Sequence, residues 1–122
     1  MFGLLVGVVG ACGAGKSSLV AGLQARGIRV RHIAQEHSYV PDMWKRLTHP
    51  DILIFLEVSY ENTVLRRKLD WTEAEYAEQL HRLRHARLNA DLVLDTNSLT
   101  VSQVLEAAMA FIDTAASQPT KK

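Results

Sequence analysis

Hydrophobic and polar residues alternate in blocks along this chain, and the blocks predict strands separated by helices. Two long apolar runs, at residues 4–9 and 51–58, are typical of strands buried on both faces of a parallel sheet. Residues 28–34 and 91–96 are shorter runs of strand type. In residues 28–34 arginines occupy alternate positions, which indicates an edge strand. The pattern therefore predicts a sheet of about four strands.

Between these runs, apolar residues recur at helical spacing. The segments predicted to be helical are residues 15–26, 42–47, 60–68, 72–89 and 100–115. The helix that starts near Thr72 is the best marked, because Thr72 and Glu75 form a capping box. Trp71 and Tyr76 occupy the hydrophobic staple positions around it. Strands that alternate with helices predict a three-layer α/β/α fold with a small, mostly parallel sheet.

The first strand and the first helix are joined by the segment Gly10-Ala11-Cys12-Gly13-Ala14-Gly15-Lys16-Ser17. This segment matches the P-loop pattern, in which two glycines flank four free positions and Gly-Lys-Ser closes the loop. Such a loop turns its backbone N–H groups inward around an anion at the start of a helix. Lys16 is expected to reach the β- and γ-phosphates and the Ser17 hydroxyl to bind Mg²⁺. The other residues predicted to contact the nucleotide here are Gly10, Cys12, Gly13, Ala14, Gly15 and Ser18.

Two other interpretations of this segment are weaker. A merely flexible glycine loop would not need a strand before it and a helix after it. A dinucleotide-binding loop would need Gly or Ala where the chain has Ser18, and it would leave Lys16 without a role. Cys12 is expected to pack inside the loop; the alternative is a thiol whose oxidation blocks the nucleotide. Triphosphate binding is the leading hypothesis.

The composition limits the class of protein. The chain has 122 residues, a formal net charge of +1 and 48% hydrophobic residues, which predict one domain over residues 1–122 with a flexible tail at 117–122. So small a charge gives no general attraction to nucleic acid or to an acidic membrane, and no apolar run is long enough to span one. The single cysteine excludes an internal disulfide and favours a cytoplasmic protein.

Phosphoryl transfer needs a carboxylate near the phosphates, either to hold Mg²⁺ or to accept a proton from the acceptor. Three acids follow predicted strands, where ligands of parallel sheets bind: Glu36, Glu57 and Asp95. Glu36 is the candidate metal ligand, and Glu36 and Glu57 are the candidate catalytic acids. The alternative for Glu36 is a solvated loop, and the alternatives for Glu57 are an ion pair with the arginine cluster or a helix-capping contact. Asp95 is expected to cap a turn.

Residues 60–90 form an arginine-rich segment that resembles a lid. Its basic residues are Arg66, Arg67, Lys68, Arg82, Arg84 and Arg87. Arginines that close over a triphosphate stabilise the charge of the transition state, and we expect this role for Arg66, Arg67 and one of Arg84 or Arg87. The alternative for the other basic residues of this segment is a solvent-exposed helix surface, where neighbouring acidic residues balance part of their charge. The histidines show no metal-ligand spacing supported by acids or cysteines.

With these residues in view, the chain resembles P-loop kinases of the nucleoside and nucleoside-monophosphate kinase group. Residues 50–59, followed by Arg66 and Arg67, are similar to the fourth strand and lid entry of thymidylate and deoxynucleoside kinases. The triplet 36–38 resembles their Glu-Arg-Ser triplet, with His in place of Arg. The resemblance implies that Glu36 is the carboxylate near the metal and the acceptor hydroxyl. It also implies that Thr96 and Asn97 contact the adenine.

The chain departs from that group between its first helix and Glu36. Those kinases insert helices and a further strand there to hold the acceptor, so the acceptor-binding part is absent or much reduced here. We predict an ATP-binding protein of the P-loop NTPase fold, a small kinase that transfers the γ-phosphoryl group to a hydroxyl or phosphate acceptor. GTP is not expected, because no Asn-Lys-x-Asp motif is present. The alternative is a regulatory or assembly module that binds nucleotide without efficient turnover. We do not expect nucleic acid as a partner, whereas pairing of sheet edges in a homo-oligomer is open.

Overall fold

The computed structural model describes residues 4–67 and 70–117, excluding the side chains of Arg67 and Ser117. Its strands are β1 (Leu5–Gly10), β2 (Arg29–His32), β3 (Ile52–Glu57) and β4 (Leu92–Asp95). They form one sheet in the order β2-β1-β3-β4, and every pair is parallel. The prediction of a small parallel sheet is confirmed, and β2 is an edge strand, as its alternating arginines indicated.

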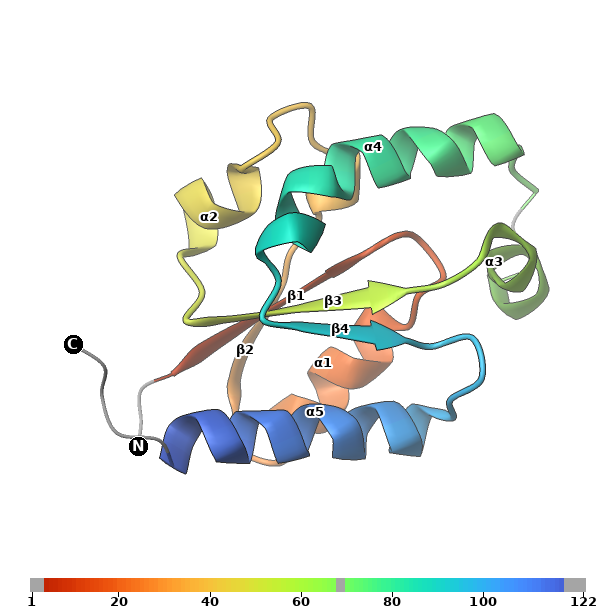
Figure 1. Ribbon diagram of the computed structural model, residues 1–122. Helices are drawn as coiled ribbons and strands as arrows, with labels where there is room; N and C mark the ends of the chain where they lie inside the picture. Colours follow the sequence, from red (N-terminus) through yellow and green to blue (C-terminus); the bar gives the residue numbers. More distant parts are fainter. Residues whose placement is uncertain (1–3, 68–69, 118–122) are drawn as a thin grey trace.

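Helices cover both faces of this sheet (Figure 1). They are α1 (Lys16–Ala25), the 3₁₀ helix η1 (Gln35–His37), α2 (Met43–Thr48), α3 (Tyr60–Arg67), α4 (Glu73–Asn89) and α5 (Val101–Ser117). In Figure 1, α1 and α5 lie below the sheet, α2 and α4 lie above it, and α3 lies beyond the carboxyl ends of β3 and β4. The arrangement is an α/β fold with helical layers on either side of the strands. Pattern analysis did not predict η1. Lys68 and residues 118–122 of the predicted tail lie outside the described residues.

The central strands are buried on both faces. Five of the six residues of β1 and five of the six of β3 are buried, which is why both read as continuous apolar runs. Leu19 and Leu23 of α1 pack on this sheet from one side and Leu83 of α4 belongs to the same core. The register pairs Gly10 with Leu56, so the segments that follow β1 and β3 start side by side.

The predicted capping of α4 is present. The Thr72 hydroxyl accepts a hydrogen bond from the Glu75 backbone N–H, and the Glu75 carboxylate accepts one from the Thr72 N–H. The rings of Trp71 and Tyr76 meet edge to face, with centroids 6.0 Å apart. These contacts fix where the arginine-rich segment resumes as a helix.

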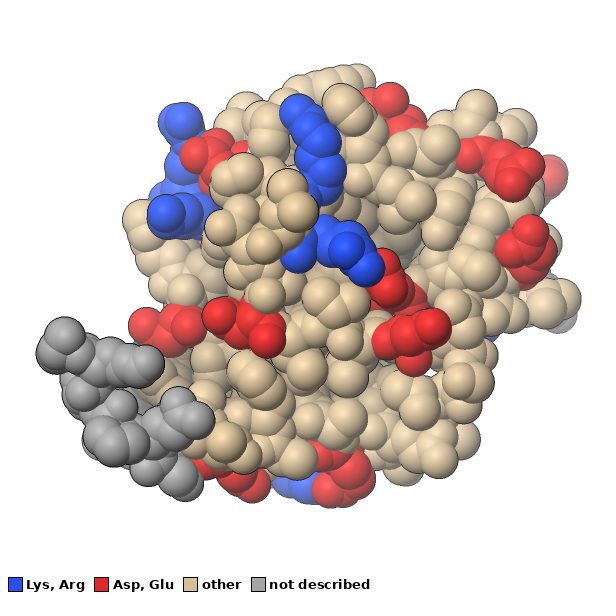
Figure 2. Space-filling model, viewed as in Figure 1, with Lys and Arg blue, Asp and Glu red and all other residues tan. Residues whose placement is uncertain are grey.

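Acidic and basic side chains lie next to one another on the face shown in Figure 2. The described part of the chain contains ion pairs such as Arg46 with Asp42 and Arg82 with Glu78. Charge of one sign therefore does not dominate this face. Among the helices of residues 4–67 and 70–117, none has the length and apolar character needed to cross a membrane.

Candidate functional site

A glycine-rich loop joins the end of β1 to the start of α1. We use this name for residues 10–17. Gly13 and Gly15 have φ angles of 88° and 100°, in the left-handed region that favours glycine. A Cβ atom on Gly13 would also lie 3.2 Å from Thr63 Cα of α3. The loop therefore has a backbone conformation that favours glycine, and at Gly13 it packs closely against α3, at the start of the arginine-rich segment.

Lys16 is the first residue of α1, and its side chain turns back into the glycine-rich loop. Its Nζ donates hydrogen bonds to the carbonyl oxygens of Gly10 at 2.7 Å and Ala11 at 3.1 Å. The same Nζ lies 3.0 Å from Glu36 Oε2, and the two side chains are only 6% and 4% exposed. The structure therefore brings together the lysine and the acid that the sequence singled out separately.

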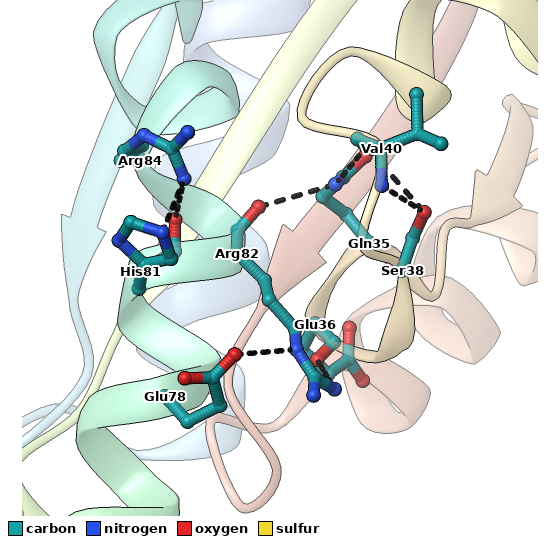
Figure 3. A network of polar contacts seen from close by, with 8 residues as sticks. All are labelled: Gln35, Glu36, Ser38, Val40, Glu78, His81, Arg82 and Arg84. Atoms are coloured by element: carbon teal, nitrogen blue, oxygen red, sulfur yellow. Dashed lines mark hydrogen bonds and ion pairs between the residues drawn. The ribbon is translucent and has the colours of Figure 1, made fainter.

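The buried position of Glu36 depends on its neighbour Gln35. The Gln35 amide donates to the carbonyl oxygens of Val40 at 2.9 Å and Arg82 at 3.1 Å, and its oxygen accepts from the Trp44 N–H at 2.9 Å. Figure 3 shows this amide between the loop after η1 and helix α4. Because Gln35 ties η1 to α2 and α4, it fixes the direction in which Glu36 points. Sequence analysis missed Gln35.

Arg82 braces the same loop from the other side. Its guanidinium pairs with Glu78 at 3.0 Å, lies 4.3 Å from the centroid of the Tyr39 ring and reaches the carbonyl oxygen of Glu36 at 3.4 Å. Figure 3 shows the side chain extending from α4 to the Glu36 backbone. Arg82 therefore serves to position the acid.

The glycine-rich loop opens into a cavity of about 660 Å³, which we call the loop cavity. Its lining consists of residues 12–18, His32, Glu36, Arg66 and residues 99–101. Ser17 and Ser18 are exposed in it, at the first turn of α1. Gly15, the N-cap of that helix, makes no side-chain cap hydrogen bond, so the helix N-terminus is available to an anion.

His32 ends β2 and lines the loop cavity, although sequence analysis gave it no role. Burial lowers the pKa of its imidazole below the ordinary value of 6.5, and the charge of Lys16 lowers it further. The Glu36 carboxylate acts in the opposite direction. The place of His32 at the carboxyl end of a strand was the available signal.

Arg66, for which the sequence predicted a lid role, also lines the loop cavity. Its guanidinium donates to the hydroxyl of Thr96 at 3.0 Å and to the Thr96 carbonyl oxygen. Thr96 is buried, and its hydroxyl lies 2.9 Å from the Glu57 carbonyl oxygen. The prediction for Arg67 concerns a side chain outside the described residues.

Glu57 and Asn97 do not line the loop cavity. Glu57 pairs with Arg87 at 2.5 Å, which is the alternative that the sequence left open for it. Asn97 accepts from the Ser59 N–H and donates to Asp95, which caps the turn as expected. Glu57, Arg87 and Asn97 all line a second cavity of about 310 Å³. Residues 99–101, which follow Asn97 in the chain, line the loop cavity.

The oxygen donors of the loop cavity fit a magnesium ion. The Glu36 Oε1 atom is buried and has no hydrogen-bond partner among the described residues. A buried carboxylate oxygen in that state is expected to have a partner, and a cation supplies one. Mg²⁺ prefers oxygen ligands, and one or two protein oxygens with phosphate oxygens are its usual set. Ser17 and Glu36 offer this donor type at one cavity.

Cys12 is held at the edge of the same cavity by helix α4. Its backbone N–H donates to Gln79 Oε1 at 3.0 Å, and Gln79 Nε2 donates to the Cys12 sulfur at 3.2 Å. The sulfur also lies 3.9 Å from His37 Nε2. Cys12 is only partly exposed, so it packs within the glycine-rich loop and also lines the cavity.

Comparison with known proteins gives no family for this chain. No protein-family model matches it, and neither does any curated protein. The functional argument therefore depends on the chemistry of the loop cavity.

Proposed function

We propose that this chain is an ATP-binding protein of the P-loop NTPase fold and acts as a small kinase. One observation carries the proposal. Lys16 Nζ lies inside the glycine-rich loop, at the start of α1 and 3.0 Å from Glu36, in the wall of a cavity of about 660 Å³. A cation, a helix N-terminus and a buried acid at one cavity form an arrangement that suits a metal triphosphate.

Each group of the loop cavity then has a task in binding ATP. Lys16 exchanges the carbonyl oxygens of Gly10 and Ala11 for phosphate oxygens, and the backbone N–H groups of the loop surround the same phosphates. Arg66, which donates to Thr96 in this structure, lines the cavity from the α3 side. Residues 99–101 provide the wall for the base.

Ser17 and Glu36 would hold Mg²⁺, which supplies positive charge to the phosphates. In the transfer step, an oxygen of the acceptor forms a bond to the γ-phosphorus. The bond from that phosphorus to the β,γ-bridging oxygen breaks, and ADP leaves. A hydroxyl acceptor gives up its proton in this step. Glu36, which contacts Lys16, is the carboxylate that would accept this proton or orient the hydroxyl. Glu57 is the weaker candidate, because Arg87 holds its carboxylate at another cavity.

A thermal shift experiment tests nucleotide binding. We expect Mg·ATP to raise the Tm of the protein, by the equivalent of about 2.7 kcal/mol at a concentration one hundred times the Kd. Lys16→Ala should abolish the shift. Lys45→Ala removes an exposed lysine of α2 and should leave the shift unchanged. A wild-type protein whose Tm does not respond to millimolar ATP or GTP contradicts the proposal.

A regulatory or assembly module is the second candidate. It is favoured by the direct path of the chain from α1 through β2 to η1, which leaves no inserted element to hold an acceptor. Release of γ-phosphate to water or to a pool of acceptors separates the two functions. A kinase transfers it and loses the activity in Glu36→Gln, whereas a module binds ATP and releases no phosphate above background.

A further inference from the structure

Three different metal-ligating groups meet beside the glycine-rich loop. They are the Cys12 sulfur, a carboxylate oxygen of Glu36 and an imidazole nitrogen of His37, and all three atoms lie within 4.8 Å of one another. His37 Nε2 is 3.9 Å from the sulfur and 3.7 Å from Glu36 Oε2. The histidine follows the acid directly in η1, and Gln79 of α4 holds the cysteine.

The two separations that involve His37 are close to those of a tetrahedral zinc site, and the third, between the Cys12 sulfur and the Glu36 oxygen, is at most 4.8 Å. Zinc lies about 2.3 Å from a cysteine sulfur and about 2.0–2.2 Å from nitrogen or oxygen ligands, so two ligands lie about 3.6 Å apart for S and N and about 3.4 Å apart for N and O. The observed separations of 3.9 and 3.7 Å exceed these only by a few tenths of an ångström. His37 has a 59% exposed side chain that is free to make this adjustment.

The other oxygen of the same carboxylate also suits a cation. Glu36 Oε1 is buried without a hydrogen-bond partner among the described residues, while Oε2 carries the contact with Lys16. The metal would therefore bind Oε1, while Oε2, from which the 3.7 Å separation to His37 is measured, keeps its contact with Lys16. A thiolate and an imidazole beside it select zinc rather than magnesium, because Mg²⁺ prefers oxygen alone.

We propose that Cys12, Glu36 and His37 bind one zinc ion, or a similar thiophilic divalent ion, with the fourth position open to water. The thiol releases its proton to solvent when the metal binds, so the affinity falls as pH is lowered. Zinc and Mg·ATP share Glu36 and the mouth of the loop cavity, so zinc competes with the nucleotide. This last statement rests on the proposed function; the metal site itself does not.

Titration of the nucleotide-free protein with Cd²⁺ tests the site, with the thiolate-to-metal absorption band as readout. Because the chain has a single cysteine, any band reports on Cys12. We expect the band to saturate at one ion per chain. Cys12→Ser should remove it, and His37→Asn should weaken Cd²⁺ and Zn²⁺ binding by at least about 10-fold. His81→Asn, which changes another exposed histidine, should bind as the wild type does.

The controls separate this proposal from the nucleotide site. His37 is exposed, so His37→Asn is expected to keep the wild-type Tm. Binding with wild-type affinity in His37→Asn overturns the three-ligand site and leaves only a reactive thiol. Absence of the band at stoichiometric metal overturns it entirely. A protein that gives the band but no Tm shift with Mg·ATP retains the metal site and loses the proposed function.

Discussion

The Lys16 ammonium and the Glu36 carboxylate lie 3.0 Å apart, and both side chains are almost completely removed from solvent. Lys16 starts α1, and Glu36 belongs to η1, which follows the edge strand β2. The contact thus ties the edge of the sheet to the glycine-rich loop. A buried charge left without its partner is strongly destabilising, although the intact pair need not add net stability.

Lys16→Met is therefore expected to lower the free energy of unfolding by about 3–5 kcal/mol, because it leaves the buried Glu36 carboxylate with only the exposed His37 ring, 3.7 Å away, in place of the ammonium. The double variant Lys16→Met/Glu36→Gln should recover part of this loss, since its amide carries no charge. Urea denaturation measures both values. Lys45→Met, at an exposed position, should stay within about 0.5 kcal/mol of the wild type. A double variant no more stable than Lys16→Met would show that the loss has another origin.

The two glycines of the loop should respond differently to alanine. Gly15→Ala meets open space, so only the left-handed φ of 100° opposes it, at a cost of about 1–2 kcal/mol. Gly13→Ala has a similar backbone problem at φ 88°, and its Cβ would also press on Thr63 at 3.2 Å. We expect Gly13→Ala to be the more destabilising of the two in urea denaturation. Equal effects would indicate that α3 yields to the new methyl group.

The sheet could be predicted from the sequence because its signals are local. Continuous apolar runs mark β1 and β3, and alternating arginines mark β2 as an edge. The capping box of α4 is likewise contained within four residues. Each of these features depends on neighbours in the chain, so a single sequence is enough to find it.

The partners inside the site could not be predicted, because they depend on tertiary contacts. The sequence named Lys16 and Glu36 but could not show that they touch, and it left Glu57 open between metal contact and an ion pair. Arg87, in the last turn of α4, decided that question by pairing with Glu57. Cys12 and His37 had no recognisable ligand spacing, since loop and η1 approach only through the fold.

Gln35 should be essential for the geometry of Glu36. Its side chain is fully buried and serves three backbone groups, those of Val40, Trp44 and Arg82. Gln35→Met keeps the length of the side chain but removes its three hydrogen bonds to these backbone groups. We therefore expect the unfolding free energy to fall by at least about 3 kcal/mol. Gln24→Met, at an exposed position of α1, is the matched control. A loss below about 1 kcal/mol would mean that the loop after η1 finds other partners.

Glu57 provides a test of which acid serves the nucleotide. Its carboxylate pairs with Arg87 at a partly exposed position, so Glu57→Gln should change stability by at most about 1 kcal/mol. Because Glu57 does not line the loop cavity, the Kd for Mg·ATP should also stay near the wild-type value. Glu36→Gln, by contrast, should weaken Mg·ATP binding at least about 10-fold. Isothermal titration calorimetry on the two variants compares them directly, and a reversed order would move the metal site to the end of β3.

His32 should make the stability of the protein depend on pH. Burial and the charge of Lys16 hold the pKa of His32 below 6.5, against the opposing effect of Glu36. The unfolded chain therefore takes up more protons than the folded one in the window below pH 6.5, and the contribution of His32 to stability is lost as pH falls through that window.

Urea denaturation of the wild type and of His32→Gln, between about pH 5 and 8, isolates this effect from the other histidines. The unfolding free energy of the wild type should fall relative to that of His32→Gln as the solution is acidified below pH 6.5, and the difference should be constant above it. Mg·ATP brings negative charge to the cavity that His32 lines, so saturating nucleotide should reduce this acid-induced loss. A wild-type unfolding free energy that instead falls relative to that of His32→Gln as pH rises above 6.5 would require a raised pKa for His32, with the Glu36 carboxylate outweighing burial and Lys16.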